Sequence, residues 1–341
     1  RPCVLGRVID DVPLADRPAR RFDRPLARRR RPSGEYIRTT QLVGLYSYPV
    51  SHPTPGRYMI ETAALDLLVQ GSVPLGTTQT EAYRAVQSDQ LLNASFWVNI
   101  ALAGLSILLF VFMGRRVEDP RAQLIFVATL MVPLVSISSY VGLASGLTIS
   151  FLEMPAGHAL AGEEVLTMWG RYLTWALSTP MILLALGLLA GSNVTKLFTA
   201  IAADIGMCVT GLAAALTTSS YLLRWVWYAI SCAFFLVVLY VLLVEWAEDA
   251  EVAGTAEIFD TLKLLTVVLW LGYPVVWALG AEGFAVIDVA VTSWAYSGMD
   301  IIAKYLFAFL LLRWVVENER TVASMASGLG AATRSASGTD D

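Results

Sequence analysis

Four ionisable side chains within long apolar stretches are the residues best placed to do chemistry: Arg171, Asp204, Asp300 and Lys304. Ionisable groups are costly inside a membrane and mark functional sites by default. Asp300 and Lys304 are four residues apart, so on a helix they share one face and can pair. A buried lysine also suits Schiff-base chemistry, because desolvation favours the neutral, nucleophilic amine. From these residues alone, a packing ion pair and a covalent cofactor site are about equally supported.

A second set of polar side chains recurs at helical spacing. Arg171, Thr174 and Ser178 fall at positions i, i+3 and i+7, which places them in one stripe of hydrogen-bond donors without a carboxylate. The simplest interpretation of the two hydroxyls is that each one bonds the carbonyl four residues earlier, which is common in membrane helices. For the hydroxyls taken alone, that interpretation is the favoured one.

An aromatic stripe lies further along the chain. Trp270, Tyr273 and Trp277 share the same i, i+3, i+7 spacing, beside Pro274. Interfacial aromatics gather near helix ends, whereas Trp270 and Tyr273 lie in the middle of an apolar stretch. Aromatic stripes usually serve packing, but one that faces a lysine–aspartate pair supports a cofactor box equally well.

The elements that must position these residues are predicted to be membrane-spanning helices. The sequence is 56% hydrophobic, with a mean hydropathy of +0.60, which is more apolar than soluble domains are. Crossing about 30 Å of hydrocarbon takes about 20 residues. Short connections indicate antiparallel neighbours in one all-α membrane bundle. Seven stretches qualify: 92–114, 121–148, 168–190, 195–217, 223–247, 256–280 and 293–316.

Two connecting segments are expected to be ordered. A short hairpin or ordered loop is predicted within 149–167, and an amphipathic helix within 79–91. Basic residues then set the orientation, because cytoplasmic loops carry an excess of them. The side with Arg84 and Arg224 is predicted to be extracellular, together with the N-terminus. The cytoplasmic side, with the C-terminus, would carry Arg115, Arg116, Arg121, Lys196, Lys263, Arg313 and Arg320.

Four regions are expected along the chain. Residues 1–58 hold 12 basic and five acidic residues and form an Arg/Pro-rich extension that is predicted to be disordered and dispensable, with the functional chain beginning near Met59. Residues 59–91 form an external segment, 92–316 the bundle and 317–341 a disordered cytoplasmic tail. Nucleic-acid binding is not expected, because no aromatic residue is interleaved with the arginine run.

Several function classes have no support in the sequence. Its two histidines, His52 and His158, offer no metal cluster, and its three cysteines offer no disulfide framework. A Walker lysine loop and a Gly-x-Ser-x-Gly elbow are both missing, so ATP-driven and hydrolytic activities are not indicated.

Three spaced motifs of this chain resemble those of the microbial rhodopsins, and the resemblance covers about 92–316. They are Asp300-x-x-x-Lys304, Arg171-Tyr172-x-x-Trp175 and Trp270-x-x-Tyr273-Pro274-x-x-Trp277. Within that family, the segment Glu153–His158 and the run from Trp169 to Gly191 resemble the halorhodopsins, which are light-driven chloride pumps.

The resemblance implies that Lys304 carries all-trans retinal as a protonated Schiff base, with Asp300 as a counterion. Thr174 stands where proton pumps carry the proton acceptor, and Ala185 where they carry the donor. Together with Ser178, they resemble the signature of a chloride pump. The family also implies a homotrimer. The remaining residues implied to lie against or near the chromophore are Trp175, Trp270, Tyr273, Trp277, Tyr228, Met207 and Asp204.

A charge count supports an anion site independently. The Schiff base and Arg171 carry two positive charges against one negative charge on Asp300, since Asp204 beside an apolar ring is expected to be neutral. An uncompensated charge in a low dielectric is strongly unfavourable. We therefore expect a bound chloride that accepts hydrogen bonds from Thr174 and Ser178 and is steadied by Arg171.

Light is expected to move that anion and not a proton, because no residue of the donor stripe can accept a proton. The resemblance implies that isomerisation of retinal turns the Schiff-base N–H towards the cytoplasmic side, and the anion is expected to follow it inward. Thr266 and Lys263 are candidate exit contacts near the cytoplasmic end of the sixth helix. A helix-start hydroxyl and a snorkelling lysine describe them equally well.

Two other functions compete with a pump. A photosensor that signals through a transducer protein would share the same pocket, and the set Thr174, Ser178 and Ala185 favours the pump. A light-evoked chloride current without a partner protein would separate the two. A seven-helix receptor or transporter without retinal would lack a visible absorption band that hydroxylamine bleaches.

Overall fold

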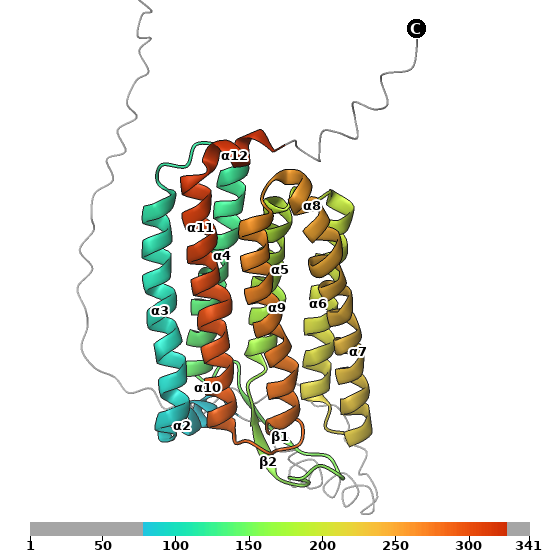
Figure 1. Ribbon diagram of the computed structural model, residues 1–341. Helices are drawn as coiled ribbons and strands as arrows, with labels where there is room; N and C mark the ends of the chain where they lie inside the picture. Colours follow the sequence, from blue (N-terminus) through green and yellow to red (C-terminus); the bar gives the residue numbers. More distant parts are fainter. Residues whose placement is uncertain (1–77, 326–341) are drawn as a thin grey trace, which may run out of the picture. The chain divides into compact units, whose positions relative to one another are not determined.

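The structure is a computed structural model that describes residues 78–325. The predictions for residues 1–58 therefore lie outside the described residues, as do those for most of the external segment and for the tail beyond residue 325. The described part is a bundle of long helices with a two-stranded hairpin at one end (Figure 1).

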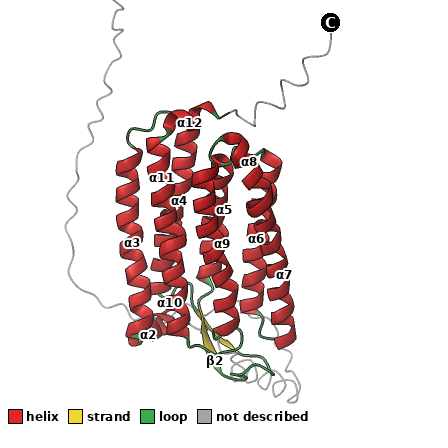
Figure 2. Ribbon diagram, viewed as in Figure 1, coloured by secondary structure: helices red, strands yellow, loops and turns green. Residues whose placement is uncertain are grey.

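Seven helical segments run the length of the bundle (Figures 1 and 2), which confirms the predicted fold. Six of them are long and apolar enough to cross a membrane. The remaining one is the last segment, residues 289–317, in which the π-helical stretch η2 separates two shorter α-helices. The segments are α3 (Gln90–Gly114), α4 (Pro120–Ala144), α5 (Gly170–Leu189), α6 (Val194–Leu216), the run α7 (Tyr221–Tyr240), η1 (Val241–Glu245) and α8 (Trp246–Ala253), α9 (Ala256–Leu279), and the run α10 (Val289–Asp300), η2 (Ile301–Leu306) and α11 (Phe307–Glu317).

Side-chain caps fix where several of these helices begin. Asp119, Asn193, Ser220 and Asp288 each accept a hydrogen bond from a backbone N–H of the first turn that follows. The second spanning helix ends at Ala144, four residues before the predicted 148, because the chain turns there. The turn contains Gly146 at a φ of +71°, where a Cβ would lie 2.4 Å from the backbone nitrogen of Tyr83.

Both ordered connections are confirmed. Strands β1 (Ser150–Glu153) and β2 (Glu164–Thr167) pair antiparallel, with Ser150 opposite Thr167. The amphipathic segment forms α2 (Gln79–Ser88), which begins with a capping box between Thr78 and Glu81 and buries Ala82 and Val86. The side-chain amide of Gln79 donates to the carbonyl of Ser145 over 2.5 Å, which ties α2 to the turn after α4.

The core runs along the inside of the bundle, and α5 is the most deeply buried of the six membrane-length helices. Apolar residues on the outer faces remain exposed, among them Leu108, Phe198 and Leu236. In a soluble protein such faces would be unfavourable, whereas they suit a lipid environment.

The tail that was predicted to be disordered from residue 317 is helical in its described part. Helix α11 extends to Glu317, and α12 follows (Glu319–Ser324). The carboxylate of Glu319 accepts from the backbone N–H groups of Glu118 and Asp119, each over 2.6 Å, and Val322 is fully buried. These contacts fix α12 against the start of α4, and they join residues too distant in sequence for the prediction to include.

Candidate functional site

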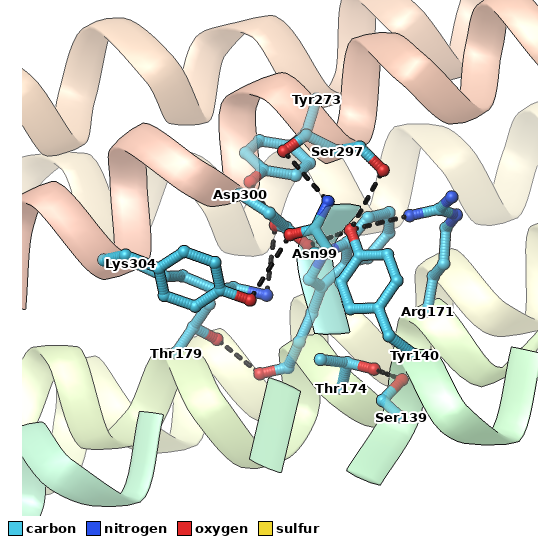
Figure 3. A network of polar contacts seen from close by, with 12 residues as sticks. Asn99, Ser139, Tyr140, Arg171, Thr174, Thr179, Tyr273, Ser297, Asp300 and Lys304 are labelled. Carbon is cyan, nitrogen blue, oxygen red and sulfur yellow. Dashed lines mark hydrogen bonds and ion pairs between the residues drawn. The ribbon is translucent and has the colours of Figure 1, made fainter. Parts of the chain in front are cut away.

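A buried ion pair lies at the centre of the site. The Nζ atom of Lys304 is 3.0 Å from Oδ1 of Asp300, and both side chains are at most 2% exposed (Figure 3). The hydroxyl of Tyr140 on α4 donates to Oδ2 over 2.8 Å, and that of Tyr273 on α9 donates to Oδ1 over 2.6 Å. Donors from three parts of the bundle therefore hold this carboxylate in one orientation.

The π-helical stretch η2 begins directly after Asp300 and contains Lys304. A π turn widens the helix locally and is frequent at functional sites. The ammonium group of Lys304 contacts Asp300 as an ion but has no well-directed hydrogen-bond partner within residues 78–325. A buried amine with so little polar contact suits covalent attachment of a ligand.

Lys304 also lines a cavity of about 740 Å³ free of protein atoms, part of which is open to the outside. Its walls are mainly aromatic. Trp175 meets Tyr273 edge-to-face with ring centroids 5.3 Å apart, and Tyr228 stacks on Trp277 at 4.8 Å. The cavity thus fits an elongated apolar group such as retinal, whose aldehyde end would meet the amine of Lys304. The predicted residues that line it are Lys304, Trp175, Trp270, Tyr273, Trp277, Tyr228 and Met207.

Asp204 does not line this cavity, although it adjoins the wall. It is fully buried on α6, and its Oδ2 accepts from the hydroxyl of Thr179 on α5 over 2.6 Å. Its other oxygen has no partner among the described residues. Thr179 lines the cavity, so its side chain lies between the cavity and Asp204.

Arg171 lies on the other side of the ion pair and is 3% exposed. Its guanidinium donates to the hydroxyl of Tyr140 over 3.2 Å and to that of Ser293 over 2.6 Å. It also lies 5.3 to 5.7 Å from the ring centroids of Phe96, Tyr140 and Tyr296. Contacts from α3, α4 and α10 thus fix a positive charge near Asp300.

The two hydroxyls of the donor stripe differ. Thr174 donates to the carbonyl of Gly170, four residues earlier, over 3.0 Å, as the simple interpretation predicts, and it also contacts the hydroxyl of Ser139 (Figure 3). For Ser178 that interpretation is wrong. Its hydroxyl is fully buried and has no hydrogen-bond partner within the described chain. A buried polar atom without a partner is uncommon and costs free energy, so it points to a ligand.

The candidate exit residues have local partners. The ammonium of Lys263 pairs with Asp260 over 2.6 Å and lies 5.6 Å from the ring centroid of Phe259. Thr266 is 1% exposed and donates to the carbonyl of Leu262 over 2.8 Å. These contacts agree with the simple interpretation of both residues, a helix-start hydroxyl and a snorkelling lysine. Their role in anion exit stays a prediction.

Several residues of the site were not predicted. Tyr140 holds Asp300 and Arg171 together, and Ser293 holds Arg171. The polar group Ser136, Ser138, Ser139 and Tyr140 inside an apolar stretch was the available signal for the first of these. The cavity-lining residues that were missed are Tyr172, Thr179, Cys208, Gly211, Ser231, Cys232, Phe235, Pro274 and Tyr296.

Comparison with known proteins agrees with this architecture. The family profile described as bacteriorhodopsin-like protein matches residues 90–318. A halorhodopsin from Halobacterium sp. (strain SG1) is 83% identical over 276 residues, which cover 81% of this chain and 97% of the relative.

Solved structures give the same result. A structure described as halorhodopsin, a light-driven chloride pump, matches with a TM-score of 0.68 and 69% identity, covering 69% of this chain and 99% of its own. The bromide-bound form of halorhodopsin from Halobacterium salinarum matches with a TM-score of 0.69 and 69% identity, covering 70% and 99%. With a seven-helix fold and a lysine-ended aromatic cavity, this chain belongs to the bacteriorhodopsin-like family of multi-pass membrane proteins.

Proposed function

We propose that this protein is a light-driven pump that carries chloride and related halides into the cell, with retinal attached to Lys304. The observation that carries the proposal is the donor stripe of α5. It offers the guanidinium of Arg171, which shares the hydroxyl of Tyr140 with Asp300, and the unpartnered buried hydroxyl of Ser178. Relatives named halorhodopsin support the same activity.

The residues present fit retinal. Lys304 would hold it covalently, while Trp175, Trp270 and Trp277 would confine its chain and ring. When bound, retinal supplies light absorption and a change of shape at its attachment point. Asp300, held by Tyr140 and Tyr273, provides the fixed negative charge beside that point.

The charges around the site favour a bound anion. Arg171 and the nitrogen of Lys304 are two positive charges, and Asp300 is one negative charge. Ser178 has a hydroxyl free to donate, and Thr174 lies one turn earlier on the same face. No carboxylate of the stripe can take a proton, so we propose that the anion is the species moved.

The direction of transport follows from the proposed orientation. The basic residues at the end with α12 and near the connections after α3, α5 and α8 support a cytoplasmic location for that end, with the β1–β2 hairpin outside. Inward transport then runs from the hairpin side to the α12 side. A homotrimer is also proposed, which the mass of the detergent-solubilised protein would test.

The decisive experiment is to illuminate sealed vesicles or cells in chloride and then in sulfate, with and without a protonophore. An inward chloride pump drives passive proton uptake that the protonophore increases and that sulfate abolishes. A proton pump would show a signal that the protonophore collapses. A photosensor would move no ion without its partner protein.

Replacing Thr174 by Asp is expected to end chloride transport. The new carboxylate would lie on the stripe beside the ion pair and supply the missing negative charge itself. We expect the chloride-dependent shift of the visible spectrum to disappear, with at most weak outward proton movement, because Ala185 provides no proton donor. Unchanged chloride transport in this variant would contradict the charge argument.

Replacing Ser178 by Ala separates ligand binding from packing. Its hydroxyl has no partner in residues 78–325, so its removal should not lower the thermal stability of the protein. Loss of one hydrogen bond to an anion corresponds to about 1.5–3 kcal/mol, or a rise of roughly 10- to 100-fold in the chloride concentration for half-saturation. Spectral titration with chloride measures this. An unchanged titration would show that the anion binds elsewhere.

A further inference from the structure

A seam of buried polar side chains joins α3 to the last helical segment, outside the aromatic cavity. Ser95 and Asn99 lie four residues apart on one face of α3, and their partners on the last segment are Ser293, Ser297 and Tyr305. All five are at most 5% exposed, and none of them lines the cavity. We call these five residues the α3 seam. Buried polar groups inside a membrane bundle are costly unless they are paired, so these contacts specify how the two segments pack.

One end of the α3 seam reaches Arg171. The guanidinium of Arg171 donates to the hydroxyl of Ser293 over 2.6 Å. The Ser293 hydroxyl lies 2.7 Å from that of Ser95, and the Ser95 hydroxyl donates to the carbonyl of Leu92 over 2.7 Å. Because Ser95 uses its one proton on Leu92, Ser293 is the donor between the two serines. Two hydroxyls thus connect the charge of Arg171 to the backbone of α3.

The other end of the α3 seam reaches the residue next to Lys304. The hydroxyl of Tyr305 in η2 donates to Oδ1 of Asn99 over 3.3 Å. The amide of Asn99 donates in turn to the carbonyls of Ser95 and Ser297, over 3.3 and 3.4 Å (Figure 3). Asn99 therefore uses its acceptor and its donor at once, and it contacts the last segment at two places.

Ser297 connects the α3 seam to the counterion. Its hydroxyl donates to the carbonyl of Ser95 over 3.1 Å and lies 3.4 Å from the hydroxyl of Tyr140. Tyr140 is the residue that donates to Asp300 and accepts from Arg171. The α3 seam thus contacts both ends of the charged site without lining the space that a ligand would fill.

The π-helical stretch η2 is the part of the last segment that most needs a contact from outside. A π turn is rare and widens the helix locally, so its geometry depends on the surrounding contacts more than that of a regular α-helix does. Lys304 and Tyr305 are adjacent in η2, and adjacent side chains of a helix do not face the same way. A hydrogen bond that holds Tyr305 towards α3 therefore sets the direction in which Lys304 points.

We propose that Asn99 is a positioning residue for Lys304: by holding Tyr305 and Ser297, it fixes the rotation of η2 and so the distance of the Lys304 nitrogen from Asp300. The proposal rests on the proposed function, because it concerns how the same retinal and anion sites are held. Electrostatic interactions weaken with distance. A small rotation of η2 therefore changes both the colour of a pigment on Lys304 and the affinity for an anion nearby.

The first test is a double-mutant cycle with Asn99→Leu, Tyr305→Phe and the double variant, each produced with retinal. Each single variant should absorb at longer wavelength, because a weaker interaction with Asp300 leaves the positive charge of the pigment more delocalised. Spectral titration should show a rise of roughly 2- to 10-fold in half-saturating chloride, which corresponds to about 0.4–1.4 kcal/mol. The double variant should shift no further than Asn99→Leu, because Tyr305 acts through the Asn99 oxygen.

Asn93→Leu is the matched control. It makes the same exchange on α3 but outside the α3 seam, where the amide of Asn93 donates to the side chain of Gln87 over 3.3 Å. Its absorption maximum and its chloride titration should equal those of the unaltered protein. Equal shifts in Asn93→Leu and Asn99→Leu would show that any lost amide on α3 has this effect, which would overturn the proposal.

The second test needs no retinal. Backbone amide hydrogen exchange in the retinal-free protein should be faster over residues 301–306 in Asn99→Leu and in Tyr305→Phe, with unchanged exchange in α6. Tyr305→Phe decides the matter if Asn99→Leu does not fold, because it removes one hydroxyl and keeps the ring. Unchanged colour, titration and exchange in Tyr305→Phe would overturn the proposal, and so would additive shifts in the double variant.

Failure of this proposal can be told from failure of the proposed function. An unaltered protein whose spectrum does not respond to chloride, and which moves no chloride in light, contradicts the pump. The absorption maximum and the hydrogen exchange of the variants still test Asn99 in that case. A chloride-pumping protein whose colour and half-saturating chloride are the same in all four forms contradicts only the role of Asn99.

Discussion

The Lys304→Ala protein is expected to form no visible pigment when it is produced with retinal. Lys304 is the one lysine of the described chain whose Nζ reaches the aromatic cavity. Lys196 pairs with Asp249 over 2.9 Å and Lys263 with Asp260 over 2.6 Å, both near helix ends. Neither can supply the amine, so the absorption spectrum should show only free retinal.

Lys196→Ala is the matched control, because it also removes a lysine and an ion pair but leaves the cavity intact. It should form pigment in normal yield, and hydroxylamine should bleach that pigment in light. Circular dichroism would show whether the Lys304→Ala chain keeps its helices, since Asp300 loses its ion-pair partner but keeps the hydroxyls of Tyr140 and Tyr273. A stable red-shifted retinal band in Lys304→Ala would exclude the proposed attachment.

The helices were predictable because hydropathy and length determine them. All seven spanning segments lie within a few residues of their predicted positions, except where a local turn or cap decides the end. Gly146 ends α4 early, and η1 and α8 extend the fifth segment to Ala253. The π-helical stretch around Lys304 was not predicted, because it depends on how the seventh segment packs against its neighbours rather than on a motif.

The parts of the site that lie on a single helix could be predicted from the sequence. The pair Asp300 and Lys304 and the stripe of α5 follow from helical spacing alone. The contacts between helices were not predictable in the same way. Tyr140 bridging Asp300 and Arg171, and Tyr172 donating to Glu282, join residues that are 31 to 160 positions apart. Such pairs depend on the order and rotation of the packed helices, which local periodicity does not contain.

Arg171 is the residue on which the proposed anion site depends most, because its contribution to the site is its positive charge. Hydrogen bonds hold the guanidinium in place. Tyr140 and Ser293 engage two of its nitrogens, and Ser293 is itself bonded to Ser95 on α3 over 2.7 Å. Three aromatic rings surround it. A neutral side chain of similar shape would keep part of these contacts and remove the charge alone.

Arg171→Gln is therefore expected to bind retinal but to lose nearly all halide binding and transport. With the guanidinium gone, Lys304 and Asp300 compensate each other, and an added anion becomes the excess charge. Removing one partner of a buried charge pair costs about 3–5 kcal/mol, or roughly a 100- to 4,000-fold rise in half-saturating chloride. Chloride titration of the visible spectrum and light-driven uptake in vesicles measure the change, and Arg313→Gln, which removes an exposed arginine of α11, is the control. A normal chloride-dependent spectrum in Arg171→Gln would show that the anion does not bind at the stripe of α5 that carries Arg171, Thr174 and Ser178.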